Sequence, residues 1–231
     1  MAERPIFVPR TDGQRLVEEV LIEFTWHPGF APSQKKKNIV ELHEAARKKG
    51  YNSILEVSTK SEEKLGQRLS AFNLKVEMEG VGVIPLESAY QGSKVFEKGG
   101  PFKDLYWVEP REAKRDPRLK ESGRLCGFEF CSDFWELEPK TAFYDWLYIR
   151  AIYEHRGFLE RLNSYSGFSD IEFNPGTSLN CQARSCAMFV SLTRKNLLSE
   201  AVSSKEEFIS ILRPDAFAQH HSVDLKQGKL F

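Results

Sequence analysis

The sequence predicts a helix-rich α+β fold, a single compact domain with a few short strands. At least five segments place apolar residues at helical spacing, the strand-like segments are short, and these strands do not alternate with helices as in a parallel βαβ sheet. A chain of 231 residues can also bury one substantial core. We therefore expect a main domain over residues 1–195, with 1–50 as an N-terminal strand and helix extension and 196–231 as a C-terminal helix and polar tail.

The first elements are a strand and a helix. Apolar and polar residues alternate in part over 16–26, which predicts a strand. A helix is expected over 34–49, where Ser33 can cap the start and Gly50 can close the end. His43 lies on the inner stripe of this helix, and we interpret it as a satisfied helix residue and not as a ligand.

The central helix is predicted over 86–98, because Pro85 can precede a helix without wasting a donor and Gly99 and Gly100 end it. Before it we expect a strand over 52–58, a helix over 61–69 and a hairpin over 76–83. After it we expect a charged helix over 111–120 interrupted by Pro117, a strand over 125–130, a long helix over 141–163, a loop or short strand over 168–175, and helices over 178–192 and 204–212.

The charge is balanced, with 33 Lys and Arg against 33 Asp and Glu. A balanced chain has no overall electrostatic footprint for tracking along duplex DNA. Basic residues gather locally at 35–37 and within 111–120. These clusters favour holding a few phosphates, such as a diphosphate bridge, over coating a long backbone.

The chain has no 18-residue apolar run and no secretory signal, so we expect a cytoplasmic protein without a membrane partner. Its four cysteines lack zinc-ribbon spacing, and we interpret them as reduced, buried small hydrophobes. No metal and no cofactor are expected.

Four polar residues of the central helix point to chemistry. Glu87, Tyr90, Gln91 and Lys94 are spaced by three, four and seven, so on a helix they share one face. An acid, an amine and two hydrogen-bonding groups on one rigid stripe can form an active site. The alternative is a solvated face with an incidental salt bridge.

These four residues resemble the Glu-x-x-[Phe/Tyr]-Gln-x-x-Lys signature of the NADAR family, whose members cleave N-glycosidic bonds and process ADP-ribosylated guanine. Segments 69–73, 113–116 and 145–146 follow in the order of that family. Segments 34–38, 143–148 and 180–184 are similar to one branch, the NADAR antitoxins paired with DarT-type DNA ADP-ribosyltransferase toxins. The resemblance implies a NADAR-like catalytic domain over residues 1–195.

The resemblance implies roles for individual residues. Glu87 would be the acid or base, Lys94 a nucleophilic or electrostatic amine, and Asp145 a second carboxylate. Lys114 and Arg115 would hold the diphosphate, with Asp116 orienting them. The remaining candidates for substrate binding are Ser70, Phe72, Asn73, Tyr90, Gln91, Asn180 and Arg184.

Three positions carry further expectations. Asn180 can instead cap the helix that follows it. Ala71 and Ser88 stand where the family usually has Asn and His, so a shifted base pocket is expected.

The implied function is removal of ADP-ribose from guanine in DNA, single-stranded or with the base flipped, by cleavage of the N-glycosidic bond. ADP-ribose would be the product, the chain would act as the antitoxin of a DarT-type toxin, and the toxin itself is a further candidate partner. Two alternatives stay open. One is an N-glycosidase on a free metabolite such as a riboflavin-pathway intermediate, and the other is a non-catalytic module that binds ADP-ribose or the toxin.

Overall fold

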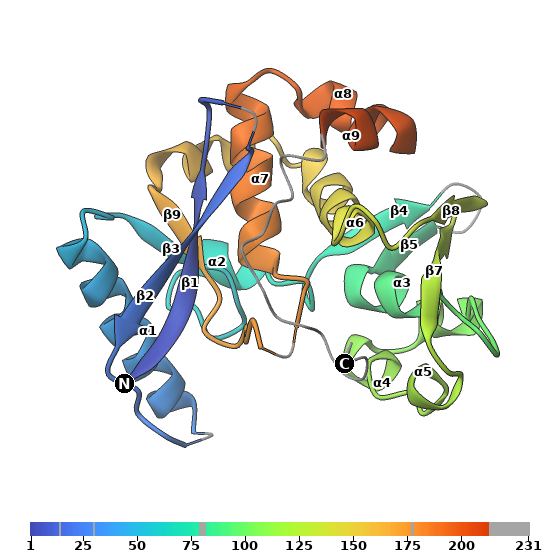
Figure 1. Ribbon diagram of the computed structural model, residues 1–231, viewed down its shortest axis with the longest axis horizontal. Coiled ribbons are helices and arrows are strands. Elements are labelled where there is room, and N and C mark those ends of the chain that lie inside the picture. The colour runs from blue at the N-terminus through green and yellow to red at the C-terminus, as the bar shows by residue number, and fades with distance from the viewer. Residues whose placement is uncertain (14, 30, 79–81, 177, 213–231) are drawn as a thin grey trace.

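A computed structural model describes residues 1–212 except 14, 30, 79–81 and 177 (Figure 1). It confirms the helix-rich α+β fold with short strands. The strands are β1 (Ala2–Pro9), β2 (Val17–Phe24), β3 (Ile54–Glu56), β4 (Lys75–Met78), β5 (Gly82–Pro85), β6 (Lys94–Phe96), β7 (Leu125–Phe130), β8 (Asp133–Trp135) and β9 (Gly167–Ser169). The α-helices are α1 (Pro32–Lys48), α2 (Lys64–Arg68), α3 (Leu86–Gly92), α4 (Pro110–Ala113), α5 (Arg118–Glu121), α6 (Ala142–Tyr153), α7 (Gln182–Arg194), α8 (Leu198–Ser203) and α9 (Lys205–Ile211). Two 3-10 helices are η1 (Lys103–Trp107) and η2 (Phe158–Ser164).

The strands of the described residues form three small sheets. The largest has the order β2-β1-β9-β3, in which β9 pairs antiparallel with β1 and parallel with β3. The second is the hairpin of β4 and β5, and the third has the order β6-β7-β8. Residues far apart in the sequence therefore meet at β9, whose carboxyl end leads into the segment before α7.

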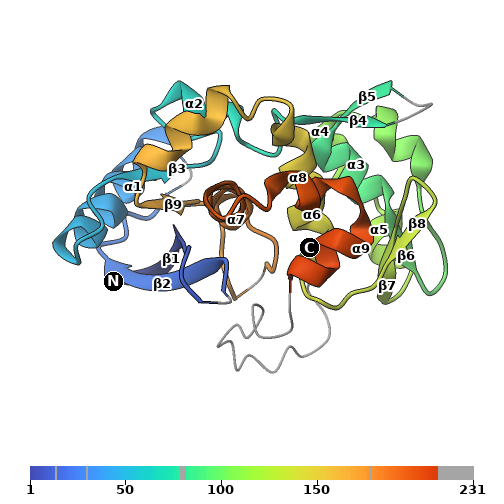
Figure 2. The ribbon, with the colours of Figure 1, turned by 90° about the horizontal axis from the view of Figure 1, so that it is seen from above.

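Helix α7 lies in the middle of the molecule, between the four-stranded sheet and α6, as the two ribbon views show (Figures 1 and 2). Ten of its residues, from Ala183 to Leu192, are buried. They join the larger core with the aromatic face of α6, and α1 covers a smaller core over β1 and β2. Because α7 packs on both sides, the place of its first turn relative to α6 and β9 is fixed by the core.

The central helix is shorter than predicted. It ends at Gly92, and Lys94 lies in β6, where it pairs with Phe128 of β7. Ser93 turns the chain: its hydroxyl donates to the carbonyl of Ala89 and contacts the hydroxyl of Tyr106 at 3.2 Å. Pairing with β7 thus overrides the helical spacing, and the prediction that Lys94 shares a helix face with Glu87 is wrong.

Other boundaries also differ from expectation. Ser33 does not cap α1, because the helix begins one residue earlier at Pro32 after Ala31. The long helix predicted over 141–163 ends at Tyr153, and α7 begins at Gln182, later than position 178. The break of the charged helix at Pro117 and the strand over 125–130 are confirmed.

The four cysteines divide into a buried pair and an exposed pair. Cys181 and Cys186 are buried as expected, but Cys126 and Cys131 are exposed, so the prediction of four buried thiols is wrong for that pair. The polar tail with its two histidines lies outside the described residues. Within the described part of the chain, no helix is long and apolar enough to cross a bilayer, and no cluster of metal-binding side chains is found.

Candidate active site

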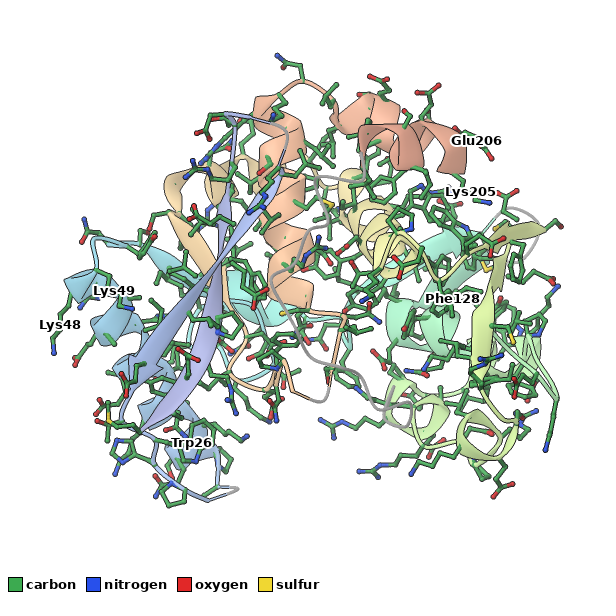
Figure 3. The ribbon with its side chains drawn as sticks, viewed as in Figure 1. Trp26, Lys48, Lys49, Phe128, Lys205 and Glu206 are labelled. Carbon is green, nitrogen blue, oxygen red and sulfur yellow. The ribbon has the colours of Figure 1, made fainter. Side chains whose placement is uncertain are left out.

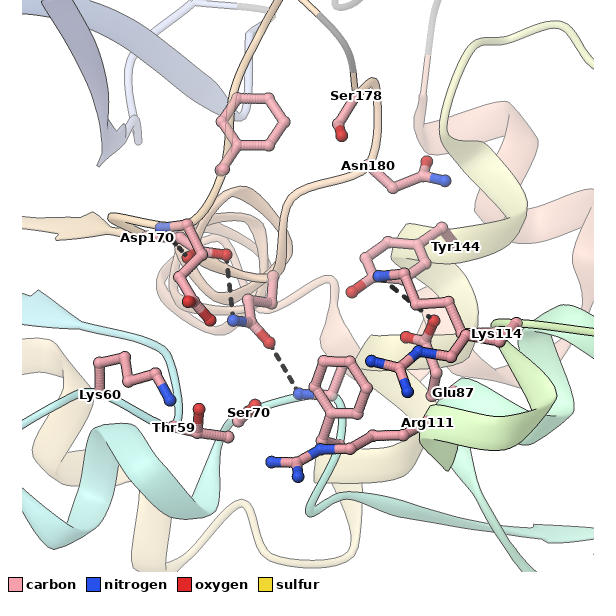
Figure 4. A pocket seen from close by; sticks show the side chains of 16 residues that line it. Thr59, Lys60, Ser70, Glu87, Arg111, Lys114, Tyr144, Asp170, Ser178 and Asn180 are labelled. Atoms are coloured by element: carbon pink, nitrogen blue, oxygen red, sulfur yellow. Dashed lines mark hydrogen bonds and ion pairs between the residues drawn. The ribbon is translucent and has the colours of Figure 1, made fainter. Parts of the chain in front are cut away.

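A cavity of about 510 Å³ lies where α3, α4, α6 and the first turn of α7 meet (Figure 4). Its wall is built from segments that are distant in the sequence. The lining residues are Thr59, Lys60, Ser70, Ala71, Phe72, Glu87, Arg111, Lys114, Arg115, Tyr144, Asp170, Glu172, Phe173, Ser178, Asn180 and Gln182. The cavity therefore contains six of the residues named from the sequence: Ser70, Phe72, Glu87, Lys114, Arg115 and Asn180.

Glu87 is the acid that helix α3 presents to the cavity, although the residue is only 5% exposed. Its Oε1 accepts a hydrogen bond from Gln91 Nε2 at 2.9 Å and lies 3.7 Å from Lys114 Nζ. Among the described residues Oε2 has no such partner. One oxygen is thus anchored and the other is left for a ligand.

Basic side chains surround this acid. Arg111 and Lys114 lie beside Glu87, while Lys60 lies on the opposite wall (Figure 4). In the part of the chain that the structure describes, Arg111, Arg115 and Lys60 make no ion pair. Free cations at the rim of a cavity are suited to phosphate oxygens.

The loop after α2 contributes an aromatic ring and a hydroxyl. The Phe72 ring lines the cavity with Lys114 Nζ 5.3 Å from its centroid. Ser70 Oγ is buried and has no hydrogen-bond partner among the residues that the structure describes. The loop is fixed by Gln182, whose Oε1 accepts from the backbone N–H of Ala71 at 2.7 Å.

Asp170 is a cavity residue that sequence reasoning missed. It lies on the wall opposite Glu87 and accepts a hydrogen bond from Gln182 Nε2 at 3.0 Å (Figure 4). Burial raises the pKa of Asp170, and the neighbouring carboxylate of Glu56 raises it further. The local sequence gives little signal for this acid, because the strand before it, β9, has a single apolar side chain, Phe168.

Glu56 holds the backbone around Asp170 in place. Its carboxylate accepts from Ser169 Oγ at 2.6 Å, from the Ile171 N–H at 2.9 Å and from Ser58 Oγ at 2.7 Å. Burial also raises the pKa of Glu56. Two acids next to one another in a buried place favour the protonated form of at least one of them.

Lys94 is buried behind the cavity and does not line it. Its Nζ lies 5.0 Å from the centroid of the Tyr90 ring, and only 7% of the residue is exposed. Burial lowers the pKa of Lys94 to about 8, with Glu87 raising it and Lys114 lowering it. Both groups act on Lys94 electrostatically, so the amine lies near the acid even though it comes from a strand.

Tyr90 and Asn180 form one hydrogen-bonded pair. Asn180 Nδ2 donates to the Tyr90 hydroxyl at 2.5 Å. Asn180 precedes α7, and its side chain does not cap that helix, so the capping alternative is wrong. Gln91 is buried next to Glu87, and its Oε1 has no hydrogen-bond partner in the described part of the chain.

Asp145 and Arg184 were expected at the substrate, but they do not line the cavity. The Asp145 carboxylate bonds Arg184 Nη1 and also accepts from Ser185 Oγ at 2.6 Å and Thr141 Oγ1 at 2.7 Å. Both residues are buried. Because a buried acid needs such partners, we correct their role to one of joining α6 to α7.

Two further candidates lie away from the cavity. Asn73 donates to the carbonyl of Gln67. Asp116 bonds Arg118 at 2.9 Å, so the expectation that it orients Lys114 and Arg115 is wrong. Neither residue lines the cavity.

Fold and cavity define a class of protein: a helix-rich α+β protein with an acid and several cations around one ligand-sized cavity. The chain belongs to the family of DarT1-associated NADAR antitoxins, whose family model matches residues 2–222. This match confirms the resemblance to the DarT-associated branch, and the chain is accordingly an antitoxin associated with DarT1. A comparison with curated proteins gave no match.

Proposed function

We propose that this antitoxin is an ADP-ribosyl glycohydrolase that removes ADP-ribose from guanine bases in DNA by cleaving the N-glycosidic bond. The observation that supports this most directly is Glu87, an acid with one anchored and one free oxygen in a cavity rimmed by unpaired cations. A diphosphate can bind those cations while the sugar lies against the acid.

The acid and the amine have complementary parts in the reaction. Glu87 moves a proton at the sugar–base linkage or stabilises the positive centre at C1. In the covalent route the nitrogen lone pair of guanine expels the ring oxygen, which takes up a proton. The neutral Lys94 amine then adds to C1, a step that requires its side chain to move from behind Tyr90 into the cavity. Guanine then leaves with a proton, and water hydrolyses the Schiff base to regenerate lysine and release ADP-ribose.

Asp170 is the second acid that we assign to this site. Its raised pKa favours the protonated carboxyl, which can donate a hydrogen bond or a proton to the substrate from the wall opposite Glu87. Lys60, Arg111 and Arg115 would hold the diphosphate, and Phe72 would pack against the sugar or a base.

The test compares Glu87→Gln with Glu112→Gln, which changes an exposed glutamate of α4 that does not line the cavity. The substrate is a single-stranded oligonucleotide with ADP-ribosylated guanine, and the readout is free ADP-ribose. We expect Glu87→Gln to lower kcat by about 10²–10⁴-fold and Glu112→Gln to keep wild-type activity. Full activity of Glu87→Gln would refute the assignment.

Trapping with borohydride tests the covalent route separately. Reduction during turnover should leave an ADP-ribosyl adduct on Lys94, which peptide mass spectrometry can locate. If turnover proceeds and no adduct forms, Lys94 has an electrostatic role only. A Glu87→Gln protein that releases no ADP-ribose yet still protects cells from the toxin would instead favour the binding-module alternative.

A further inference from the structure

A second, smaller cavity of about 190 Å³ adjoins the candidate active site. Tyr144 and Asn180 line both cavities, and the hydrogen bond from Asn180 to the Tyr90 hydroxyl lies at their junction. Tyr90 is one helical turn after Glu87 on α3. The two cavities are thus neighbours, and the hydrogen-bonded pair of Tyr90 and Asn180 forms a short polar partition between them.

The wall of the second cavity is aromatic. Phe128 of β7, labelled in Figure 3, packs in a cluster with two other rings: its centroid is 5.4 Å from that of Tyr90 and 4.8 Å from that of Phe143, and the latter two are 6.1 Å apart. Aromatic walls of this kind suit a flat ring system. A volume of about 190 Å³ corresponds to roughly six water molecules, which is room for one planar base and not for a nucleotide with its phosphates.

The polar groups of this cavity differ from those of the main one. Glu136 and Glu138 line it beside a single ammonium, Lys140, whereas the main cavity has four basic side chains. Two carboxylates repel phosphate, but they accept hydrogen bonds from N–H groups. The ring and amino N–H groups of guanine are such donors.

We propose that the second cavity holds the guanine base while the ADP-ribosyl group occupies the main cavity. This inference rests on the proposed glycohydrolase function. The bond to be cleaved then lies at the partition, next to Glu87, with the diphosphate on the cationic side and the base among the aromatic rings. Glu136, which has no partner among the described residues, accepts from the guanine edge.

The experiment measures binding without turnover. Deoxyguanosine is titrated by calorimetry into the free protein and into protein saturated with ADP-ribose, and we expect similar affinities because the ligands occupy different cavities. Leu137→Trp fills the second cavity from its rim and should weaken deoxyguanosine binding and raise KM for the modified oligonucleotide by about tenfold each. ADP-ribose affinity should not change.

Leu21→Trp is the matched control, because Leu21 is 40% exposed against 38% for Leu137 but lies on β2. Three outcomes would each overturn the proposal. Deoxyguanosine and ADP-ribose compete for binding, deoxyguanosine does not bind detectably, or Leu137→Trp loses affinity for ADP-ribose alone. If Leu137→Trp does not fold, Glu136→Gln is tested instead. We expect this variant to show a smaller ratio of deoxyguanosine affinity to deoxyadenosine affinity than the wild type. A protein that binds deoxyguanosine but releases no ADP-ribose would contradict the proposed function and leave this cavity a guanine site.

Discussion

At the scale of single residues, the site depends on how its acid and its amine are held. Both contacts of Glu87, with Gln91 and Lys114, are made by Oε1. They fix the orientation of the carboxylate and leave Oε2 without a close partner among the described residues. Lys94 lies behind Tyr90, where burial favours the neutral amine. With a pKa of about 8, roughly a tenth of Lys94 is neutral at neutral pH, far more than for an exposed lysine.

The lowered pKa of Lys94 predicts the pH dependence of the rate. Only the neutral amine attacks C1, so kcat/KM should rise as the pH increases through about 8. Lys114→Ala removes a positive charge that lowers this pKa, and the rising limb should move to higher pH. A pH-independent rate in the wild type, or an unmoved limb in Lys114→Ala, would rule out this titration as part of catalysis.

At the scale of elements, the turn between α3 and β6 decides where the amine lies. An added Cβ at Gly92 would come 2.6 Å from Tyr106 Cδ1, so only glycine allows η1 to pack against the end of α3. Lys94 then enters β6 and is held by the register with β7.

Gly92→Ala should therefore destabilise the protein by about 1–3 kcal/mol, because Tyr106 must move out of a packed position. Urea unfolding followed by fluorescence measures the change. Gly157→Ala is the control, since nothing lies within 4 Å of its added Cβ, and it should change stability by less than about 0.5 kcal/mol. Equal stability of Gly92→Ala and wild type would show that this contact does not constrain the turn.

Local patterns predicted the helix that became α1 and strand β7 well, because each has a clear period and nothing overrides it. His43 was also interpreted correctly: Ser169 donates to Glu56, so His43 donates its Nε2–H to the Ser169 hydroxyl, at 2.8 Å. Lys94 was misplaced because strand pairing with β7, where its partner is Phe128, outweighs helical spacing. Asp170 was missed because its role depends on Glu56 and Gln182, which no local pattern connects to it.

At the scale of the whole molecule, buried titratable groups join the sheet to the cavity. His43 on α1, Glu56 on β3 and Asp170 after β9 belong to one connected region through Ser169 and Ile171. Burial lowers the pKa of His43 to about 4, with the charge of Arg47 lowering it further, whereas the pKa values of Glu56 and Asp170 are raised. The region thus favours uncharged groups in the folded state.

Stability should consequently depend on pH through Asp170. The pKa of Asp170 is higher in the folded state than in the unfolded state. Its contribution to stability is therefore complete when the pH is below the pKa of the unfolded state, and it is lost as the pH rises through the pKa of the folded state. Asp170→Asn is a neutral replacement, so its stability relative to wild type should increase from pH 5 to pH 9. Urea unfolding at several pH values measures this difference. A difference that does not change with pH would contradict the raised pKa.

The proposed cleavage can be followed by mass balance on a defined substrate. Pure protein is incubated, without added metal, with an oligonucleotide that carries one ADP-ribosylated guanine, and both products are measured by mass spectrometry. We expect the oligonucleotide to return to its unmodified mass while free ADP-ribose appears in equal amount over many turnovers. An oligonucleotide that keeps its modification, or one that loses guanine together with ADP-ribose, would contradict it.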